Sequence, residues 1–127
     1  MERSSVILNR FEKSLKGSKI LVLGVAYKQD IDDYRESPAL VVIDILKKMG
    51  ADVKFFDPYI QKYKYKGEQH QGEKELSIEL LSSSDLVIVT ASHSNVDYDF
   101  VQENSTFIFD TKNAMKDVKN RENIELL

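Results

Sequence analysis

Four apolar runs of strand length, separated by stretches with helical periodicity, constrain the fold of this chain more than any other feature. The runs lie at residues 19–24, 52–57, 85–90 and 106–110. Strands that are apolar on both faces and alternate with helices are typical of a parallel sheet, in which right-handed crossovers place helices on both sides. The pattern predicts a single α/β domain, a Rossmann-like three-layer sandwich with a mainly parallel sheet of four strands.

The clearest helix is predicted between the first two runs. Ser37 can cap the free amides of a helix, and Pro38 at the first helical position has no amide to leave unpaired. Apolar residues recur at helical spacing after it, and Gly50 supplies the matching stop. Shorter helices are expected at residues 76–83 and 97–103.

Two segments do not fit the alternation of strands and helices. Residues 61–75 are almost devoid of apolar side chains apart from two tyrosines, so an exposed excursion that the core does not need is expected there. Residues 1–16 are compatible with a helix but precede the first strand, which predicts the remnant of an inter-domain linker helix. The domain itself is expected to span residues 17–127.

The composition excludes several classes of protein and of site. The formal net charge of −3 and the absence of a long basic run give no support for nucleic-acid binding. The chain has no cysteine, which excludes disulfides, zinc-thiolate sites and cysteine nucleophiles within it. Its apolar runs are far shorter than the roughly 20 residues that span a bilayer, and no secretory segment is visible, so a cytoplasmic protein without a membrane partner is predicted.

Ligands of such sheets bind beyond the carboxyl ends of the strands, so the residues after each run are the candidates for a site. Tyr27 and Lys28 offer a ring that can stack on a base and an ammonium group that can neutralise phosphate. Lys112, after the fourth run, could complete a positive pocket with Lys28. Gly24 is the single glycine of the loop after the first run, so this loop lacks the dinucleotide fingerprint G-x-G-x-x-G. The pattern favours a nucleotide diphosphate held by side chains, and the alternative is that these are ordinary loop residues.

The segment before the predicted helix carries further charged candidates. The Arg35 guanidinium and the free helix amides could bind the same anion, or Arg35 could pair with Asp32, Asp33 or Glu36 to brace the loop. Together with Asp30, the two aspartates could hold magnesium, although acidic loops are usually solvated.

Two other polar residues follow strands. Asp57 stands where nucleotide-binding folds place an acid for a ribose hydroxyl, but well beyond the usual separation of about 20 residues from the glycine loop, so an Asp-Pro turn explains it as well. His93 is a candidate acid, base or ligand, with a hydrogen-bonded surface histidine as the alternative.

Five motifs in order resemble one known family. They are GVAYK, DIDDYRESPAL, FFDPY, SHSNVDY and FDTKNAMK, at residues 24–28, 30–40, 55–59, 92–98 and 109–116. The chain is similar to the C-terminal UDP-binding domain of the UDP-glucose/GDP-mannose dehydrogenase family, over about residues 17–116. It looks nearest to the members that act on UDP-N-acetylhexosamines.

The resemblance implies a longer, homodimeric enzyme with an N-terminal NAD-binding domain, a central helical dimerisation region and this third domain closing over the nucleotide sugar. Such enzymes oxidise the primary alcohol of the sugar to a carboxylate in two hydride transfers to NAD, through a thiohemiacetal on a cysteine. Because this chain has neither a cysteine nor the NAD fingerprint, we expect an excised or truncated domain that is inactive and monomeric by itself. Its expected partners are the UDP-sugar and the N-terminal and central domains.

The resemblance also assigns roles to residues. It implies that Lys28 meets the UDP moiety with Tyr27 against it, and that Arg35 reaches toward NAD. Lys112 stands where the family commonly has an arginine; the charge is kept, but the two-pronged geometry is lost. Two other functions stay open, a stand-alone nucleotide-binding regulatory or assembly module and a metal-dependent phospho-receiver.

Overall fold

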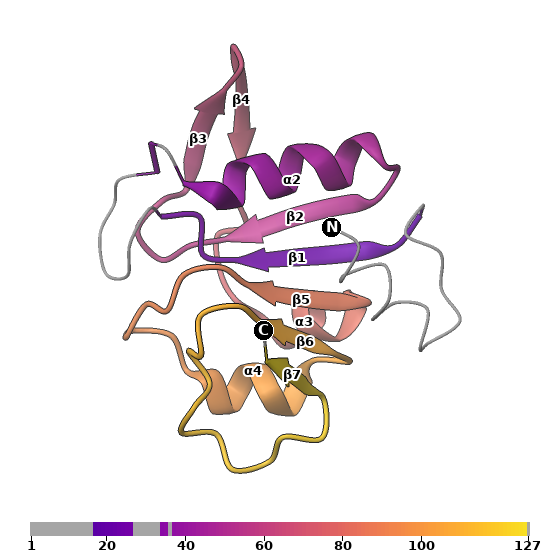
Figure 1. Ribbon diagram of the computed structural model, residues 1–127, viewed down its shortest axis with the longest axis vertical. Coiled ribbons are helices and arrows are strands. Elements are labelled where there is room, and N and C mark those ends of the chain that lie inside the picture. Colours follow the sequence, from indigo (N-terminus) through magenta and orange to yellow (C-terminus); the bar gives the residue numbers. More distant parts are fainter. Residues whose placement is uncertain (1–16, 27–33, 36, 127) are drawn as a thin grey trace.

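Five parallel strands form the central sheet of the computed structural model, which describes residues 17–26, 34–35 and 37–126 (Figure 1). The order across the sheet is β2-β1-β5-β6-β7, and every neighbouring pair is parallel. The strands are β1 (Lys19–Leu23), β2 (Asp52–Phe56), β5 (Leu86–Val89), β6 (Ile108–Asp110) and β7 (Ile124–Leu126). The predicted parallel α/β sheet is confirmed, with one strand more than expected.

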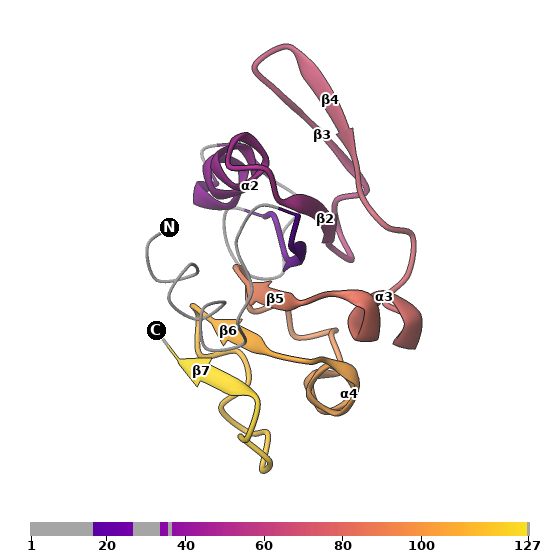
Figure 2. The same cartoon turned by 90° about the vertical axis from the view of Figure 1, so that its right-hand side faces the viewer.

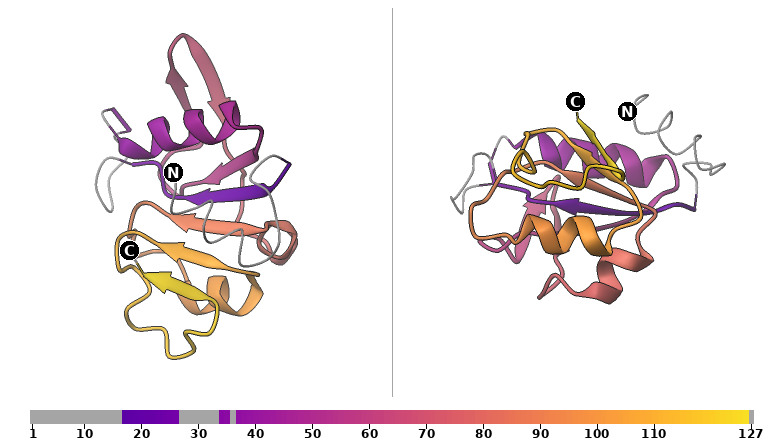
Figure 3. Two further views of the ribbon diagram at one scale, coloured as in Figure 1. Left: turned by 45° about the vertical axis from the view of Figure 1, so that its right-hand side comes forward. Right: turned by 90° about the horizontal axis from the view of Figure 1, so that it is seen from below.

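Helices cover both faces of this sheet. Helix α2 (Pro38–Lys48) lies on one face, and α3 (Ile78–Ser83) and α4 (Tyr98–Asn104) lie on the other, as the right-hand view of Figure 3 shows. Strand β1 alternates between the two layers. Ile20 and Val22 belong to the cluster that contains α2, whereas Leu21 and Leu23 belong to the cluster that contains α3 and α4. This explains why every position of the strand after Lys19 is apolar and confirms the three-layer sandwich.

Helix α2 begins and ends where its sequence predicts. The Ser37 hydroxyl accepts a hydrogen bond from the Ala39 amide at 3.2 Å, and Pro38 occupies the first turn. Gly50 follows the helix with φ +93°, a left-handed conformation that suits glycine. The face toward the sheet is formed by Ala39, Leu40, Ile43 and Leu46, all buried.

The expectation that residues 61–75 are dispensable to the core is wrong. They contain an antiparallel hairpin of β3 (Lys62–Tyr65) and β4 (Glu68–Gln71), which projects from the body of the protein in Figures 1 and 2. Tyr63 is only 2% exposed, with its ring centroid 5.1 Å from that of Phe55. Lys66 and Gly67 form the two-residue turn, both at positive φ. The hairpin thus contributes a core aromatic from an otherwise polar sequence.

The outer side of β2 is covered by the chain that leaves the hairpin. The Glu73 amide donates a hydrogen bond to the Phe55 carbonyl at 2.8 Å. The approach is close, because a Cβ on Gly72 would lie 2.5 Å from the Phe55 ring. Glycine is therefore required at position 72 by packing.

The predicted linker helix at residues 1–16 lies outside the described residues, so the proposed domain boundary stays a prediction. Within the part of the chain that the structure describes, no helix has the length and apolar character needed to cross a membrane.

Candidate functional site

The strand order creates a switch point between β1 and β5, because the chain leaves β1 toward β2 on one side and leaves β5 toward β6 on the other. Open α/β sheets bind ligands at the carboxyl ends of the strands that flank such a point. Here these ends continue into residues 24–26 after β1 and residues 90–93 after β5. We call these two loops, with residues 57–60 after β2, the switch-point edge.

Gly24 allows the loops after β1 and β5 to touch. It has φ +94°, and a Cβ at this position would lie 2.6 Å from the Ala91 Cβ and 2.9 Å from the Ala91 nitrogen. The Thr90 hydroxyl donates a hydrogen bond to the Gly24 carbonyl, and the Gly24 amide donates to the Phe56 carbonyl at 2.8 Å. The space beside this glycine is filled by protein, so the residue serves loop packing rather than close approach of a pyrophosphate.

Asp57 holds the three loops of the switch-point edge together. Its carboxylate Oδ2 accepts hydrogen bonds from the amides of Val25 and Ala26 at 2.8 and 3.1 Å. Its Oδ1 accepts from the amides of Tyr59 and Ile60 at 2.8 and 3.2 Å. The last two bonds confirm the turn expected from the Asp-Pro pair.

The environment of Asp57 stabilises its ionised form. Burial by itself would raise the pKa of this carboxyl, but hydrogen bonds from His93 and from the backbone amides of Tyr59 and Val25 outweigh burial and lower the pKa below its ordinary value of 3.8. Because the side chain is 0% exposed and its oxygens already face several donors, this carboxylate is unavailable to a ribose hydroxyl.

His93 is buried, not at the surface. Its ring is 1% exposed, and Nε2 lies 2.9 Å from Asp57 Oδ2. An ionised carboxylate has no proton to give, so Nε2–H is the donor. The Tyr59 ring meets the imidazole edge-on with centroids 4.9 Å apart, and the Tyr98 hydroxyl donates to the His93 carbonyl at 2.9 Å. The pair was missed from sequence because its members are 36 residues apart, although both follow strands at the same edge.

Lys112 follows β6 on the same edge of the sheet. The buried Asp110 organises its turn by accepting hydrogen bonds from the amides of Lys112, Ala114 and Met115 at 3.1, 3.1 and 2.9 Å. The Lys112 side chain is exposed. Because β5 alone separates β6 from β1, the loops that follow β6 and β1 start about 10 Å apart, two strand spacings.

Arg35 is exposed and lies in a hollow of about 370 Å³ between the start of α2 and the hairpin. The hollow is also lined by Tyr34, Lys64 and Tyr65. It therefore combines two aromatic rings with two cations.

Several sequence candidates fall outside the described residues, and their side chains are not placed. These are Tyr27 and Lys28, the acidic residues Asp30, Asp32 and Asp33, and Glu36. Among residues 17–26, 34–35 and 37–126, no group of three or more histidine or acidic side chains is gathered as a metal ion would require.

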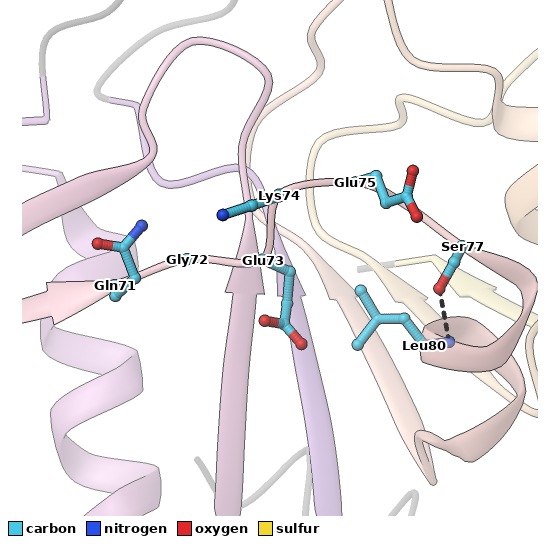
Figure 4. A pocket seen from close by; sticks show the side chains of 7 residues that line it. All are labelled: Gln71, Gly72, Glu73, Lys74, Glu75, Ser77 and Leu80. Carbon is cyan, nitrogen blue, oxygen red and sulfur yellow. Dashed lines mark hydrogen bonds between the residues drawn. The ribbon is translucent and has the colours of Figure 1, made fainter.

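A second hollow, of about 440 Å³, lies between the end of β4 and the start of α3 (Figure 4). Its charged side chains, Glu73, Lys74 and Glu75, have mixed signs. Its hydroxyl, from Ser77, accepts a hydrogen bond from the Leu80 amide at 3.1 Å as the cap of α3. We assign no ligand to this hollow.

Known proteins with similar sequences include several that are named as UDP-sugar dehydrogenases. The chain is 36% identical over 99 residues to the UDP-glucose 6-dehydrogenase of Rickettsia bellii, covering 73% of this chain and 23% of that protein. It is 31% identical over 122 residues to the UDP-N-acetyl-D-mannosamine dehydrogenase of Methanococcus maripaludis, covering 88% and 26%. The chain thus spans about a quarter of the length of these relatives.

Solved structures agree. The structure of the NDP-N-acetyl-D-galactosaminuronic acid dehydrogenase from Methanosarcina mazei superposes with a TM-score of 0.77 at 28% identity, over 98% of this chain and 27% of that one. The family model described as "UDP-glucose/GDP-mannose dehydrogenase family, UDP binding domain" matches residues 21–117, which confirms the family expected from the five motifs. The chain therefore belongs to the UDP-glucose/GDP-mannose dehydrogenase family, of which it contains the UDP-binding domain.

Proposed function

We propose that residues 17–127 bind the UDP moiety of a nucleotide sugar as the third domain of an NAD-dependent 6-dehydrogenase, with residues 1–16 as part of the linker to its other domains. The observation that carries this proposal is the family match over residues 21–117, which includes Lys28, Arg35 and Lys112. The enzyme oxidises the C6 alcohol of a UDP-hexose or UDP-N-acetylhexosamine to a carboxylate. The chain matches relatives named for each kind of substrate, so the proposal includes both kinds of sugar.

In this proposal, Lys28 and Lys112 hold the diphosphate from two sides of β5, and Tyr27 lies against the nucleotide. The support is topological: both lysines follow strands that flank β5, at the edge where ligands of this architecture bind. Lys112 is exposed and therefore available to a ligand. A lysine at position 112 neutralises phosphate as a point charge.

The proposal places the main NAD site in the N-terminal domain of the enzyme, outside residues 17–127. The single glycine of the first loop, Gly24, has its open side filled by Ala91, and no glycine fingerprint surrounds it. Arg35, exposed beside Tyr34 and Lys64, is the residue through which this chain would reach the cofactor. NAD, which the N-terminal domain of the proposed enzyme would mainly bind, is the hydride acceptor of the reaction.

The chain supplies binding and not the nucleophile, because it contains no cysteine. Its partners in the proposal are the N-terminal and central domains of the same enzyme, which is homodimeric and cytoplasmic. The stand-alone regulatory module is not favoured, since the relatives above are named as dehydrogenases.

Titration of the chain with UDP, followed by calorimetry or by NMR shifts, tests the binding proposal. Lys28→Ala and Lys112→Ala each remove one charge-assisted contact of about 1.5 kcal/mol, so each is expected to weaken UDP binding about tenfold. Lys119→Ala, which removes an exposed lysine of the same C-terminal segment, is the matched control and leaves affinity unchanged. Equal affinity of all three variants, or no UDP binding by the parent chain, contradicts the proposal.

A second assay addresses the dehydrogenase. The N-terminal and central domains of a relative are added to the chain in trans, and NADH formation from a UDP-sugar is followed. The expected result is UDP-sugar-dependent NADH formation only when both parts are present. Tight binding of the chain to an unrelated protein, with no NADH formed, would favour the regulatory module instead.

A further inference from the structure

We propose that Asp57 and His93 form a positioning pair that fixes Val25 and Ala26, the described residues that precede Tyr27 and Lys28 in the sequence, and that this pair sets the affinity for UDP. The inference rests on the proposed function, because it deepens the assignment of Lys28. It concerns two residues that need not touch the ligand.

The first argument is the number of loops that meet on one carboxylate. Asp57 Oδ2 accepts from the amides of Val25 and Ala26, the last two residues before Tyr27, and also from His93 Nε2. One buried oxygen thus joins the loop after β1 to the loop after β5, across the switch point. Charge-assisted hydrogen bonds of this kind are shorter and stronger than neutral ones, so they hold geometry well.

The second argument is that both the backbone amide and the backbone carbonyl of Ala26 are hydrogen-bonded to side chains. Its amide donates to Asp57, and its carbonyl accepts from the Ser37 hydroxyl at 3.4 Å. Ser37 is also the N-cap of α2, on the far side of residues 27–36. Ala26 and Ser37 are therefore linked to each other directly, and Ala26 is linked to Asp57 as well.

The third argument concerns what holds His93. The Tyr98 hydroxyl donates a hydrogen bond to the His93 carbonyl, and the Tyr59 ring packs against the imidazole. Tyr59 in turn donates its amide to Asp57 Oδ1. Contacts with Tyr98 of α4 and with Tyr59 of the loop after β2 thus hold the histidine in the position from which it donates to the carboxylate. This is the arrangement of a preorganised support rather than of an exposed acid or base.

The experiment compares UDP affinity at matched stability. Asp57→Asn keeps the shape but replaces one acceptor oxygen with an N–H donor, so some of the amides now facing the carboxylate lose their partner. Leu81→Ala, in the core cluster on the α3 and α4 side, is the control that lowers stability without touching the switch-point edge. We expect Asp57→Asn to weaken UDP binding about tenfold or more, and Leu81→Ala to leave it within about twofold at a temperature where both are folded.

A pair of substitutions at the histidine separates hydrogen bonding from packing. His93→Gln retains an N–H donor near the position of Nε2, whereas His93→Met fills similar space without one. We expect His93→Gln to bind UDP more tightly than His93→Met, even where the two have the same thermal midpoint. Equal affinities for the two variants overturn the inference.

Amide hydrogen exchange in the parent chain provides a readout that does not depend on the ligand. The amides of Val25 and Ala26 should be protected in the parent and should exchange faster in Asp57→Asn than in Leu81→Ala. If UDP fails to bind the parent, the proposed function fails and the UDP part of the inference fails with it. If the parent binds and Asp57→Asn binds equally, or if the two amides exchange freely in the parent, the positioning pair is refuted while the proposed function stands.

Discussion

Replacing Gly24 with alanine tests the contact between the loops after β1 and β5. The backbone at Gly24 has φ +94°, which costs an L-residue about 1–2 kcal/mol. The new methyl group would lie 2.6 Å from the Ala91 Cβ and 2.9 Å from its nitrogen, so backbone must move, at about 1–3 kcal/mol. The free energy of unfolding should therefore fall by about 2–5 kcal/mol, a sum of these two terms.

The hairpin turn offers a matched control. Gly67 has φ +82°, but a Cβ there would meet nothing within 4 Å, so Gly67→Ala should lose only the conformational part, about 1–2 kcal/mol. Urea unfolding of both variants gives the difference, expected at about 1–3 kcal/mol. If Gly24→Ala is no more destabilised than Gly67→Ala, the loops are not in contact and the described switch-point edge is incorrect.

Two further predictions concern the hairpin and pH. Tyr63→Ala removes a buried ring and should lower the free energy of unfolding by about 3–5 kcal/mol. Lys64→Ala, on the exposed face of the same strand, should change it by less than about 0.5 kcal/mol. Equal effects of the two substitutions in urea unfolding would show that the hairpin is not part of the core. Folding lowers the pKa of Asp57, so between the lowered pKa and pH 3.8 the unfolded chain binds a proton that the folded chain does not. The carboxyl therefore stabilises the fold fully above pH 3.8. This contribution is lost as the pH falls from there through the lowered pKa. Thermal midpoints measured against pH should show this acid-side loss in the parent and a smaller one in Asp57→Asn.

Helix α2 was predictable because its signals are local. Ser37, Pro38 and Gly50 act within a few residues of the helix ends, and the structure has them in the expected roles. The alternation of apolar runs likewise predicted which loops share one edge of the sheet. These features depend on short-range chemistry and on general rules of parallel sheets.

The hairpin and β7 were missed for different reasons. The alternating Lys and Tyr of residues 62–65, followed by Lys66-Gly67, is a period-two pattern with a turn, but its polar content hid the buried Tyr63. Strand β7 has only three residues, Ile124–Leu126, too few to stand out as a strand in the sequence, so only its pairing with β6 defines it. The Asp57–His93 contact could not be foreseen either, because nothing local specifies which buried partner a loop histidine meets.

The strip of chain that runs from Gly72 to Glu73 along β2 also bears on solubility. An uncovered strand at the end of a sheet presents a row of backbone groups that can recruit strands from other molecules and start aggregates. At Phe55 this protein fills that row with its own Glu73 amide, and Gly72 lets the covering segment come close enough to do so. A larger residue at position 72 would lift this cover, so its cost would include self-association at high concentration as well as lost packing.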